Sequence, residues 1–318
     1  MELRVLGAHN MESKHTRMES HLIDGVLALD AGSITRALSF DEQLGIRAII
    51  LSHRHFDHVR DLPAIGLALR NTGVTVDVYA IPDTIEFVAA KLFDGSLFPD
   101  PLNFPSPENP TLRLHPVQFY QEFKVLDYTA TAVPVPHSVP AAGFQIASGD
   151  VSLFYTGDTG RGLCEAWKHV TPTTLLAEVT FGNENEAWAL EVGHLTPNLL
   201  EEALVSFNEE RGYLPKVIVA HMSPPWEVQV KGELRRLARK LGVDLQISRA
   251  DMRVTLQPDR LRLKTVTWSD GTPPQPLSSP SRGRYLRRCR RPRPLRRHPP
   301  ADRRRMGKRL PGGRMPAP

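Results

Sequence analysis

The sequence has few cysteines and no long apolar run, and each absence excludes a class of protein. Only two cysteines, Cys164 and Cys289, occur among 318 residues, so neither a disulfide framework nor a cysteine-based metal site is expected. No apolar stretch approaches the roughly 20 residues of a membrane-spanning helix. The first ten residues, MELRVLGAHN, lack the basic and apolar regions of a secretory signal. We therefore expect a cytoplasmic protein with no membrane partner.

Acidic residues are nearly absent from the last part of the chain. Residues 281–318 contain 14 Arg and one Lys but a single acid, so this segment carries +14 while the whole chain carries +5 and the remainder −9. The segment has no Val, Ile or Phe, and 11 of the 28 prolines follow residue 270. Such a composition cannot bury enough apolar area to offset its ordering entropy. We expect a catalytic domain at 1–258, a linker at 259–280 and a disordered basic tail at 281–318.

The basic tail has three interpretations that the sequence leaves open. It can make a weak contact with nucleic acid or another anionic surface, because clustered cations attract polyanions. It can also be a solvated extension without a partner. A stretch translated from a shifted reading frame of GC-rich DNA would have the same Arg- and Pro-rich composition.

The first 258 residues alternate strand-like and helix-like patterns. With 41% hydrophobic and 24% charged residues, the composition is that of a globular protein with a real core. Helices are predicted at 82–93, at 197–211 and at 226–241, the second with Thr196 as cap and Pro197 in the first turn. Strands are predicted at 4–8, 21–32, 48–52, 74–81, 123–135, 142–147, 151–158, 174–181 and 216–222. This mixture predicts two packed sheets with helices outside them.

Three histidines and an aspartate directly follow the apolar run that ends at Leu51. The stretch IILSHRHFDHVRDL places His53, His55, Asp57 and His58 within six positions. Alternate residues of a strand point to opposite faces, so only a turn that leaves the strand can bring all four side chains together. Converging nitrogen and oxygen ligands are what a divalent metal requires. Four ligands are too few for two metals, so further ligands are expected downstream.

Three further candidates lie at the C-terminal ends of predicted strands. His137 follows TAVPVP, Asp158 ends LFYTGD, and His221 ends the strand that begins KVIVA. Open α/β folds build their sites at such strand ends. A lone histidine is usually an ordinary core or surface residue. To explain this whole set in that way, however, four independent coincidences at strand ends would be needed.

The motif HxHxDH, followed by a lone His, a TGDTG-type Asp and a late strand-end His, resembles the metallo-β-lactamase superfamily of binuclear metallohydrolases. The resemblance implies an αββα four-layer sandwich in the α/β (α+β) class and two divalent metal ions, zinc with manganese or iron as alternatives. It implies that one metal is bound by His53, His55 and His137, and the other by Asp57, His58 and His221, with Asp158 bridging. Asp30, in LALDAGS, resembles an orienting aspartate of the family and is equally well explained as a turn residue.

Within that superfamily, the segment LLAEVTFGNENEAWALEVGHLTP pairs Glu178 with His194. It resembles class II cyclic-nucleotide phosphodiesterases and, less closely, the tRNA 3′-processing endonucleases (ribonuclease Z). FPSPENP, VPVPHSVPAAGF and the segment from Leu27 to Pro63 resemble the former class. The resemblance implies that Asp57 orients the nucleophile and that His194, held by Glu178, donates a proton. A structural pair at a helix start is the alternative for Glu178 and His194.

The chain departs from these patterns at Phe56, where Leu is usual, at Asp61, where a small residue is usual, and at Ala177, where the endonucleases have His. Only 20 residues separate His137 from Asp158, too few for the long tRNA-binding arm of those endonucleases. We therefore expect hydrolysis of small phosphodiesters, 3′,5′-cyclic nucleotides first. A ribonuclease Z-like RNA endonuclease, a lactonase, a thioesterase and a non-enzymatic binding protein remain alternatives. The sequence does not fix the oligomeric state and leaves a homodimer open.

Overall fold

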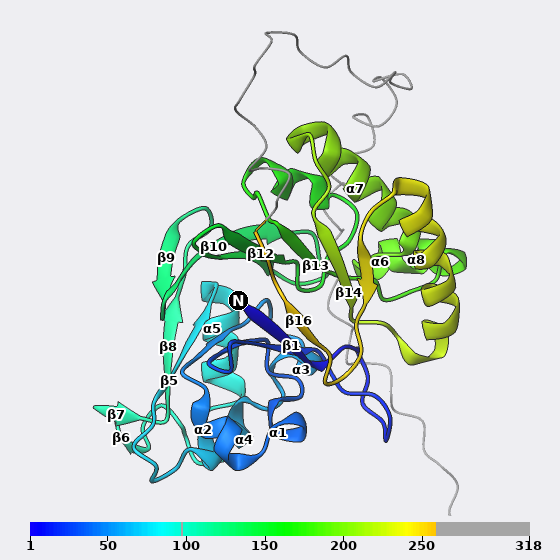
Figure 1. Cartoon of the computed structure of the whole chain (residues 1–318). Helices are drawn as coiled ribbons and strands as arrows, with labels where there is room; N and C mark the ends of the chain where they lie inside the picture. The colour runs from blue at the N-terminus through cyan, green and yellow to red at the C-terminus, as the bar shows by residue number, and fades with distance from the viewer. Residues whose placement is uncertain (97, 259–318) are drawn as a thin grey trace, which may run out of the picture.

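Two seven-stranded sheets face each other, and helices cover the outer face of each (Figure 1). The computed structural model describes residues 1–96 and 98–258. The predicted αββα sandwich is therefore confirmed, whereas the predicted linker and basic tail lie outside the described residues. Within the described part of the chain, no helix is both long enough and apolar enough to cross a membrane.

The first sheet is built from the N-terminal part of the chain and closed by one C-terminal strand. Its order is β16-β1-β2-β3-β4-β5-β8. The strands are β1 (Glu2–Gly7), β2 (Ser20–Ile23), β3 (Leu27–Leu29), β4 (Ala48–Ile50), β5 (Val76–Ala80), β8 (Leu112–Pro116) and β16 (Arg253–Thr255). Its outer face carries α1 (Ile34–Ala37), α2 (Phe40–Gly45), α3 (Phe56–Val59), α4 (Leu62–Ala68) and α5 (Pro82–Lys91).

The second sheet has the order β15-β14-β13-β12-β11-β10-β9. Its strands are β9 (Glu122–Val125), β10 (Tyr128–Val135), β11 (Ala141–Ser148), β12 (Val151–Tyr155), β13 (Thr174–Glu178), β14 (Lys216–Ala220) and β15 (Leu245–Ile247). The helical elements on this side are η1 (Leu163–Lys168), η2 (Asn183–Asn185), α6 (Glu186–Val192), α7 (Pro197–Arg211), η3 (Pro224–Trp226) and α8 (Glu227–Leu241). A small ribbon of β6 (Pro105–Ser106) and β7 (Asn109–Pro110) lies apart from both sheets.

The apolar run before the histidine motif is buried on both of its faces. Ile50 belongs to the core between the two sheets, together with Phe144 and Ile218 of the second sheet. Its neighbour Ile49 belongs instead to the core between the first sheet and its helices. A strand inside a parallel region with both faces covered is expected to be continuously apolar, which explains why β4 shows no alternation.

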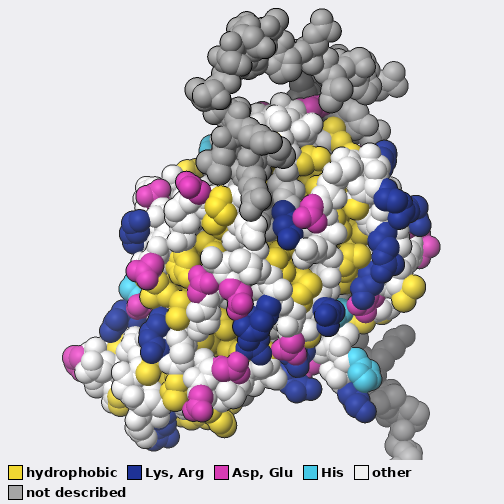
Figure 2. All heavy atoms as spheres, in the orientation of Figure 1, with side chains coloured by type: hydrophobic (Ala, Val, Ile, Leu, Met, Phe, Trp, Pro, Cys, Tyr) yellow, Lys and Arg dark blue, Asp and Glu magenta, His cyan; other side chains and the backbone are white. Residues whose placement is uncertain are grey.

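The cap residue and the apolar stripe that predicted α7 and α8 have these roles in the structure. The Thr196 side chain accepts a hydrogen bond from the Leu199 N–H, with Pro197 in the first turn, and Gly212, with a φ of 76°, caps the C-terminal end of α7. The cap satisfies one of the N–H groups that a helix start leaves unpaired. In α8 the apolar stripe, Val230, Leu234 and Leu237, is buried. Its opposite face is basic, and Figure 2 shows Lys and Arg side chains gathered over this helix.

Two predicted strands are in fact hairpins. The segment 21–32 divides into β2 and β3, joined at Asp24 and Gly25 with φ values of 47° and 75°. Successive positive φ values are the requirement of a tight hairpin turn, and Asp-Gly is a favoured pair for it. The segment 123–135 likewise divides into β9 and β10, with Leu126 at a φ of 53°. Asp24-Gly25 was thus an available signal for the first break that the prediction missed, whereas at Leu126 strand-forming residues continue into the turn.

The topology gathers several strand ends at one edge of the molecule. In the first sheet β3, β4 and β5 are parallel. In the second, β12, β13 and β14 are parallel, and β10 runs in the same direction because both β10 and β12 are antiparallel to β11. Residues that follow β3, β4, β10, β12, β13 and β14 are therefore brought together where the two sheets meet.

Gly32 makes a close approach at this edge possible. A Cβ atom at this position would lie 2.0 Å from the backbone oxygen of Asp57 and 2.6 Å from that of Glu19. We expect Gly32→Ala to lower the free energy of unfolding by about 1–3 kcal/mol or more, because backbone atoms must move apart to admit the methyl group. Urea unfolding measures the effect.

Gly232→Ala is the matched control for this substitution. Gly232 lies inside α8, and the nearest atom to an added Cβ is the end of the Arg236 side chain at 3.9 Å. An alanine there is expected to stabilise the protein by about 0.5–1 kcal/mol, because glycine is the costlier residue in a helix. Equal effects of the two substitutions would contradict the close approach at Gly32.

Candidate metal centre

The HxHxDH motif occupies the loop after β4 and the first turn of α3. His53 and His55 lie in the loop, and His55 is the N-cap of α3, with extended backbone angles. Asp57 and His58 lie inside that short helix. The change from loop to helix turns the four side chains toward one region, which an uninterrupted strand would not allow.

A first group of donor atoms comes from His53, His55, His137 and Asp158, all within 4.8 Å of one another. His137 Nε2 lies 3.1 Å from His55 Nδ1. Asp158 Oδ2 lies 3.6 Å from His53 Nε2 and 3.7 Å from His137 Nε2. His137 follows β10 and Asp158 follows β12, so this group joins one sheet to the other.

A second group comes from Asp57, His58, Asp158 and His221, again within 4.8 Å. Asp158 Oδ1 lies 3.2 Å from His58 Nε2 and 3.2 Å from His221 Nε2. His221 Nε2 is also 3.1 Å from Asp57 Oδ2 and 3.3 Å from His58 Nε2. Each oxygen of Asp158 thus faces a different group. The two donor groups together are called the cluster below.

The spacing of these atoms suits bound metal ions. Ligands at about 2.0–2.1 Å from a tetrahedral metal are about 3.3 Å from one another, close to the nitrogen–nitrogen separations in both groups. Among the described residues, the buried His53 Nε2 has no hydrogen-bond partner. Buried polar atoms are normally satisfied, so this nitrogen is placed as a ligand atom would be. Histidine and aspartate together suit zinc, manganese and iron.

Two of the histidines from the motif are anchored to Asp30. His58 Nδ1 lies 2.7 Å from Asp30 Oδ2. His53 Nδ1 lies 3.0 Å from the hydroxyl of Ser52, which donates to Asp30 Oδ2 at 2.6 Å. Tyr155 donates a third hydrogen bond, at 2.6 Å. These bonds favour the orienting role for Asp30 over the turn role, since they fix which nitrogen of each ring faces the cluster.

His137 and His221 also direct Nε2 at the donor groups, and residues on the side of the second sheet hold the Nδ1 atoms of both rings. His137 Nδ1 donates to the backbone oxygen of Gly193 at 2.8 Å, and His221 Nδ1 lies 2.9 Å from the hydroxyl of Thr180. Sequence reasoning missed Ser52 and Thr180, although both directly adjoin a predicted site: Ser52 precedes His53, and Thr180 is two residues after Glu178. A hydroxyl residue next to a ligand motif is the signal that was available.

The first group is prepared to bind metal without losing protons. Burial lowers the pKa of His53 well below its ordinary value and also lowers that of His137. Burial, with the neighbouring His137, lowers the pKa of His55 to about 4. All three imidazoles are therefore neutral near pH 7, the form in which a ring nitrogen binds metal.

The second group behaves differently because three carboxylates surround it. Burial opposes the charge of His221, but Asp158 and Asp57 outweigh it and raise the pKa to about 9. The pKa of His58 is likewise held well above its ordinary value: burial lowers it, but Asp158 and Asp57 raise it more. Burial raises the pKa of Asp158, yet the neighbouring His221 and His58 lower it well below its usual range. Without metal, this group holds protons in place of a cation.

Glu178 and His194 form the predicted pair beside the cluster. His194 Nδ1 lies 2.9 Å from Glu178 Oε1 and 3.9 Å from Asp158 Oδ2. Glu178 ends β13, and its carboxylate also accepts backbone N–H groups from Thr159 and Leu195. Burial lowers the pKa of His194, but Glu178 and Asp158 outweigh it and raise that pKa. The pair is thus adjacent to the ligands and carries a proton more readily than a free histidine.

The departures from the family patterns have local explanations. Asp61 is buried, accepts the backbone N–H of Thr35 at 2.7 Å and pairs with Arg60. The Asp61 carboxylate therefore links α1 to the segment that follows the motif. Phe56, between His55 and Asp57, is 62% exposed, so the larger side chain points into solvent instead of disturbing the core.

Two phenylalanines of the segment 93–110 pack against other parts of the chain. Phe93 is buried in the core between the first sheet and its helices. The guanidinium of Arg70 lies over the ring of Phe104, 4.4 Å from its centroid. Both rings are therefore held by residues outside the segment.

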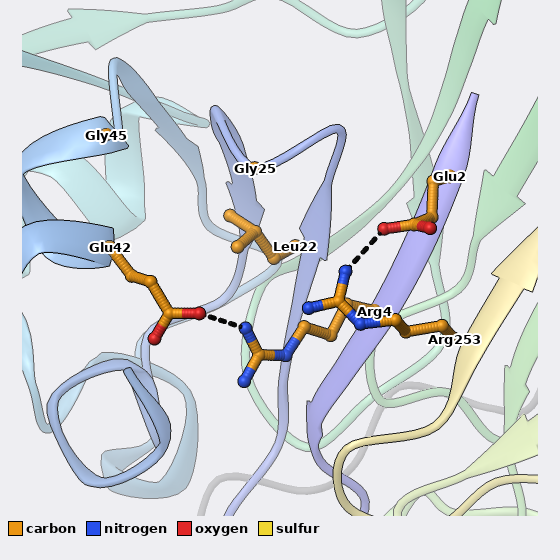
Figure 3. A pocket seen from close by; sticks show the side chains of 7 residues that line it. All are labelled: Glu2, Arg4, Leu22, Gly25, Glu42, Gly45 and Arg253. Carbon is orange, nitrogen blue, oxygen red and sulfur yellow. Dashed lines mark hydrogen bonds and ion pairs between the residues drawn. The ribbon is translucent and has the colours of Figure 1, made fainter. Parts of the chain in front are cut away.

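A pocket of about 160 Å³ lies apart from the cluster and shares no residue with it. Figure 3 shows its two arginines directed at two glutamates. Arg4 pairs with Glu42 at 2.6 Å, and Arg253 pairs with Glu2 at 2.6 Å. Because its charges neutralise one another, this pocket offers no clear preference for a charged ligand.

Comparison with known proteins agrees with the fold. Three solved structures resemble the chain over most of their own length: the metallo-beta-lactamase fold protein YhfI from Bacillus subtilis (17% identity, 80% of this chain and 99% of that one, TM-score 0.63), yeast PDE1 (16%, 78% and 96%, 0.62) and the short form of human tRNase Z, ELAC1 (16%, 81% and 100%, 0.60). At these identities the likeness shows the fold alone. A search of curated proteins finds no match.

A match to a protein-family model shows, beyond the fold, which family the chain belongs to. Residues 22–222 match the family described as the beta-lactamase superfamily domain. The matched range begins in β2 and ends one residue after His221, so it spans every residue of both donor groups. It also covers more than half of the chain. The protein therefore belongs to the metallo-β-lactamase superfamily.

Proposed function

We propose that the protein is a binuclear metal-dependent phosphodiesterase that hydrolyses small phosphodiesters, most of all 3′,5′-cyclic nucleotides to nucleoside monophosphates. The fold and the His/Asp cluster are those of a metallo-β-lactamase-fold hydrolase. The observation that carries the narrower proposal is the Glu178–His194 pair, which sets a proton donor beside the two donor groups. Likeness to yeast PDE1 and to human tRNase Z supports the same class of substrate.

In this proposal the seven predicted ligands hold two divalent ions, zinc with manganese or iron as alternatives. His53, His55 and His137 would hold one, Asp57, His58 and His221 would hold the other, and Asp158, which belongs to both groups, would be shared. Two such ions would lower the pKa of a bound water and offset charge on the phosphoryl oxygens.

The remaining chemistry belongs to the protein's own side chains. Asp57 accepts a hydrogen bond from the attacking water and orients it. His194 donates a proton to the leaving alkoxide; its Nδ1 is taken by Glu178, which leaves Nε2 for the substrate. A positioned general acid contributes about 10²–10⁴-fold to the rate.

The segment between His137 and Asp158 supports a small substrate. Apart from a few residues at either end, it consists of β11, a two-residue turn and β12, with no inserted arm that could bind a folded RNA. One observation favours RNA as a second candidate: the basic outer face of α8 in Figure 2, which includes the exposed Arg235 and Arg239. Cations on one helix face attract a phosphate backbone, so the substrate test includes RNA.

The substrate test compares cyclic AMP, cyclic GMP, a precursor tRNA and a lactone as substrates of the full chain. We expect kcat/KM for the cyclic nucleotides to exceed that for the other two, because a cyclic nucleotide needs only the cluster, a proton donor and a small pocket. His194→Ala is expected to lower cyclic-nucleotide turnover by about 10²-fold or more.

His169→Ala serves as the matched control, since His169 is exposed and contacts only Tyr120 among the described aromatic rings. It should leave turnover unchanged. Efficient tRNA cleavage without cyclic-nucleotide turnover would favour the RNA alternative, and hydrolysis of the lactone alone would place the protein among the acyl hydrolases of this fold.

Metal content tests the ligand assignment. We expect about two divalent ions per chain, as in a binuclear site, and loss of at least one when both His53 and His55 are changed to Ala. Metal analysis of the purified proteins measures this. The pair His15→Ala and His169→Ala, both on exposed side chains, should retain both ions. An unchanged metal content in the first double variant would refute the assignment.

Metal loading should also release protons, and more at neutral than at alkaline pH. At pH 7 an ion must displace the protons that His58 and His221 hold, whereas above the His221 pKa of about 9 fewer remain to be displaced. The apparent affinity of the second group therefore rises with pH up to that value. Calorimetry in buffers of different ionisation enthalpy counts the protons. An equal release at pH 7 and pH 9.5 would contradict the charge state inferred for the second group.

A further inference from the structure

The Thr180 hydroxyl lies between the second donor group and the proton donor. Its side chain is fully buried, two residues beyond the end of β13. Oγ1 lies 2.9 Å from His221 Nδ1, 2.9 Å from Glu178 Oε2 and 3.2 Å from His194 Nδ1. The backbone oxygen of His221 is a further neighbour, at 3.1 Å. One hydroxyl thus contacts a metal-facing histidine, the carboxylate that holds His194, and His194 itself.

The chemistry of the partners fixes the direction of these hydrogen bonds. His221 Nε2 faces Asp158 and Asp57, so Nδ1 bears the hydrogen when Nε2 is a ligand, and it donates to Thr180. A hydroxyl has one hydrogen to give. Of its two oxygen acceptors, the carboxylate of Glu178 is closer than the His221 carbonyl and is charged, which makes it the stronger acceptor.

At the first sheet, too, a hydroxyl and a carboxylate together hold two histidines, but these two histidines have different roles from the pair at the second sheet. There Ser52 contacts His53 Nδ1 at 3.0 Å and donates to Asp30 at 2.6 Å. Asp30 also holds His58, so both of its histidines belong to the donor groups. On the second sheet Glu178 holds one histidine of the second donor group, His221, through Thr180, and one histidine that faces the substrate, His194.

We propose that Thr180 is a positioning residue that fixes His221 for the second metal and, through Glu178, fixes His194 as the proton donor. The part that concerns His194 rests on the proposed phosphodiesterase function. The part that concerns His221 depends only on the donor geometry. The two parts can fail separately, and they need two measurements.

Zinc binding tests the first part, with Zn²⁺ alone and a competing chelator. Thr180→Val keeps the shape of the side chain and removes the hydroxyl, and Thr180→Ser keeps the hydroxyl. In the His53→Ala/His55→Ala background, where the second group alone is complete, we expect Thr180→Val to weaken zinc binding by about 10–100-fold, the usual effect of losing an outer hydrogen bond to a ligand. Thr180→Ser should restore most of the affinity.

The reciprocal background separates positioning from general damage. In His221→Ala, where the first group remains, Thr180→Val should leave zinc affinity unchanged, and Ser52→Ala should weaken it instead. Melting temperatures of all variants identify any that fail to fold. Equal zinc affinity of Thr180→Val and the parent in the first background, or an equal loss in both backgrounds, would overturn the role assigned to His221.

Leaving-group dependence tests the second part. A p-nitrophenolate needs little protonation as it leaves, whereas an alkoxide needs a proton donor. We expect Thr180→Val to slow hydrolysis of an alkyl phosphodiester more than that of bis(p-nitrophenyl) phosphate, by at least about tenfold within the range of a general acid. In a His194→Ala background this extra loss should disappear.

A uniform loss on both esters, or the same extra loss without His194, would overturn the link to the proton donor. If neither ester is hydrolysed by the parent protein, the proposed phosphodiesterase function fails, and the link to His194 fails with it. The zinc measurements then still decide whether Thr180 positions His221.

Discussion

Two buried carboxylates, each at the C-terminal end of an interior strand of one sheet, hold the side chains of the site in place. Asp30 accepts hydrogen bonds from the backbone and hydroxyl of Ser52, from Tyr155 and from His58. Glu178 accepts three backbone N–H groups as well as the Thr180 hydroxyl and His194. A buried charge is tolerated only when several donors replace water around it. The same donors that make each carboxylate tolerable also fix the rings that face the cluster.

The backbone at these strand ends is shaped for the same purpose. Asp30 follows β3 with a φ of 55°, and His221 follows β14 with a φ of 60°. Left-handed angles are costly for residues other than glycine and persist where the surroundings enforce them. Here they let a chain leaving a parallel strand turn a functional side chain toward the opposite sheet. The two strained positions lie at the point where the sheets meet.

Much of this arrangement could be predicted from the sequence, and the limits have physical causes. The donor residues were recognisable because a dense motif and three strand-end residues repeat one pattern, and the structure brings all seven within the two groups. The anchoring hydroxyls of Ser52 and Thr180 were not recognised, because Ser and Thr are common and their position next to a ligand motif is a weak signal until the contacts are seen. Of the two hairpins that were predicted as single strands, the one at Asp24-Gly25 carried a turn signal that was overlooked, and the one at Leu126 did not, because β-forming residues continue into its turn. Short helices such as α1 and α3 depend on tertiary contacts and have no periodic pattern to detect.

Both donor groups draw ligands from the two sheets: His53 and His55 meet His137 across the interface, and Asp57 and His58 meet His221. In polymer terms, an ion in either group is a cross-link between distant points of one chain. A link from His55 to His137 closes a loop of about 80 residues, and the chain-entropy estimate for removing such freedom from the unfolded state is between about 3 and 5 kcal/mol. Bound ions would therefore stabilise the packing of the two sheets. Folding of the protein would then depend on the metal available to it, through the same ligands that serve the chemistry.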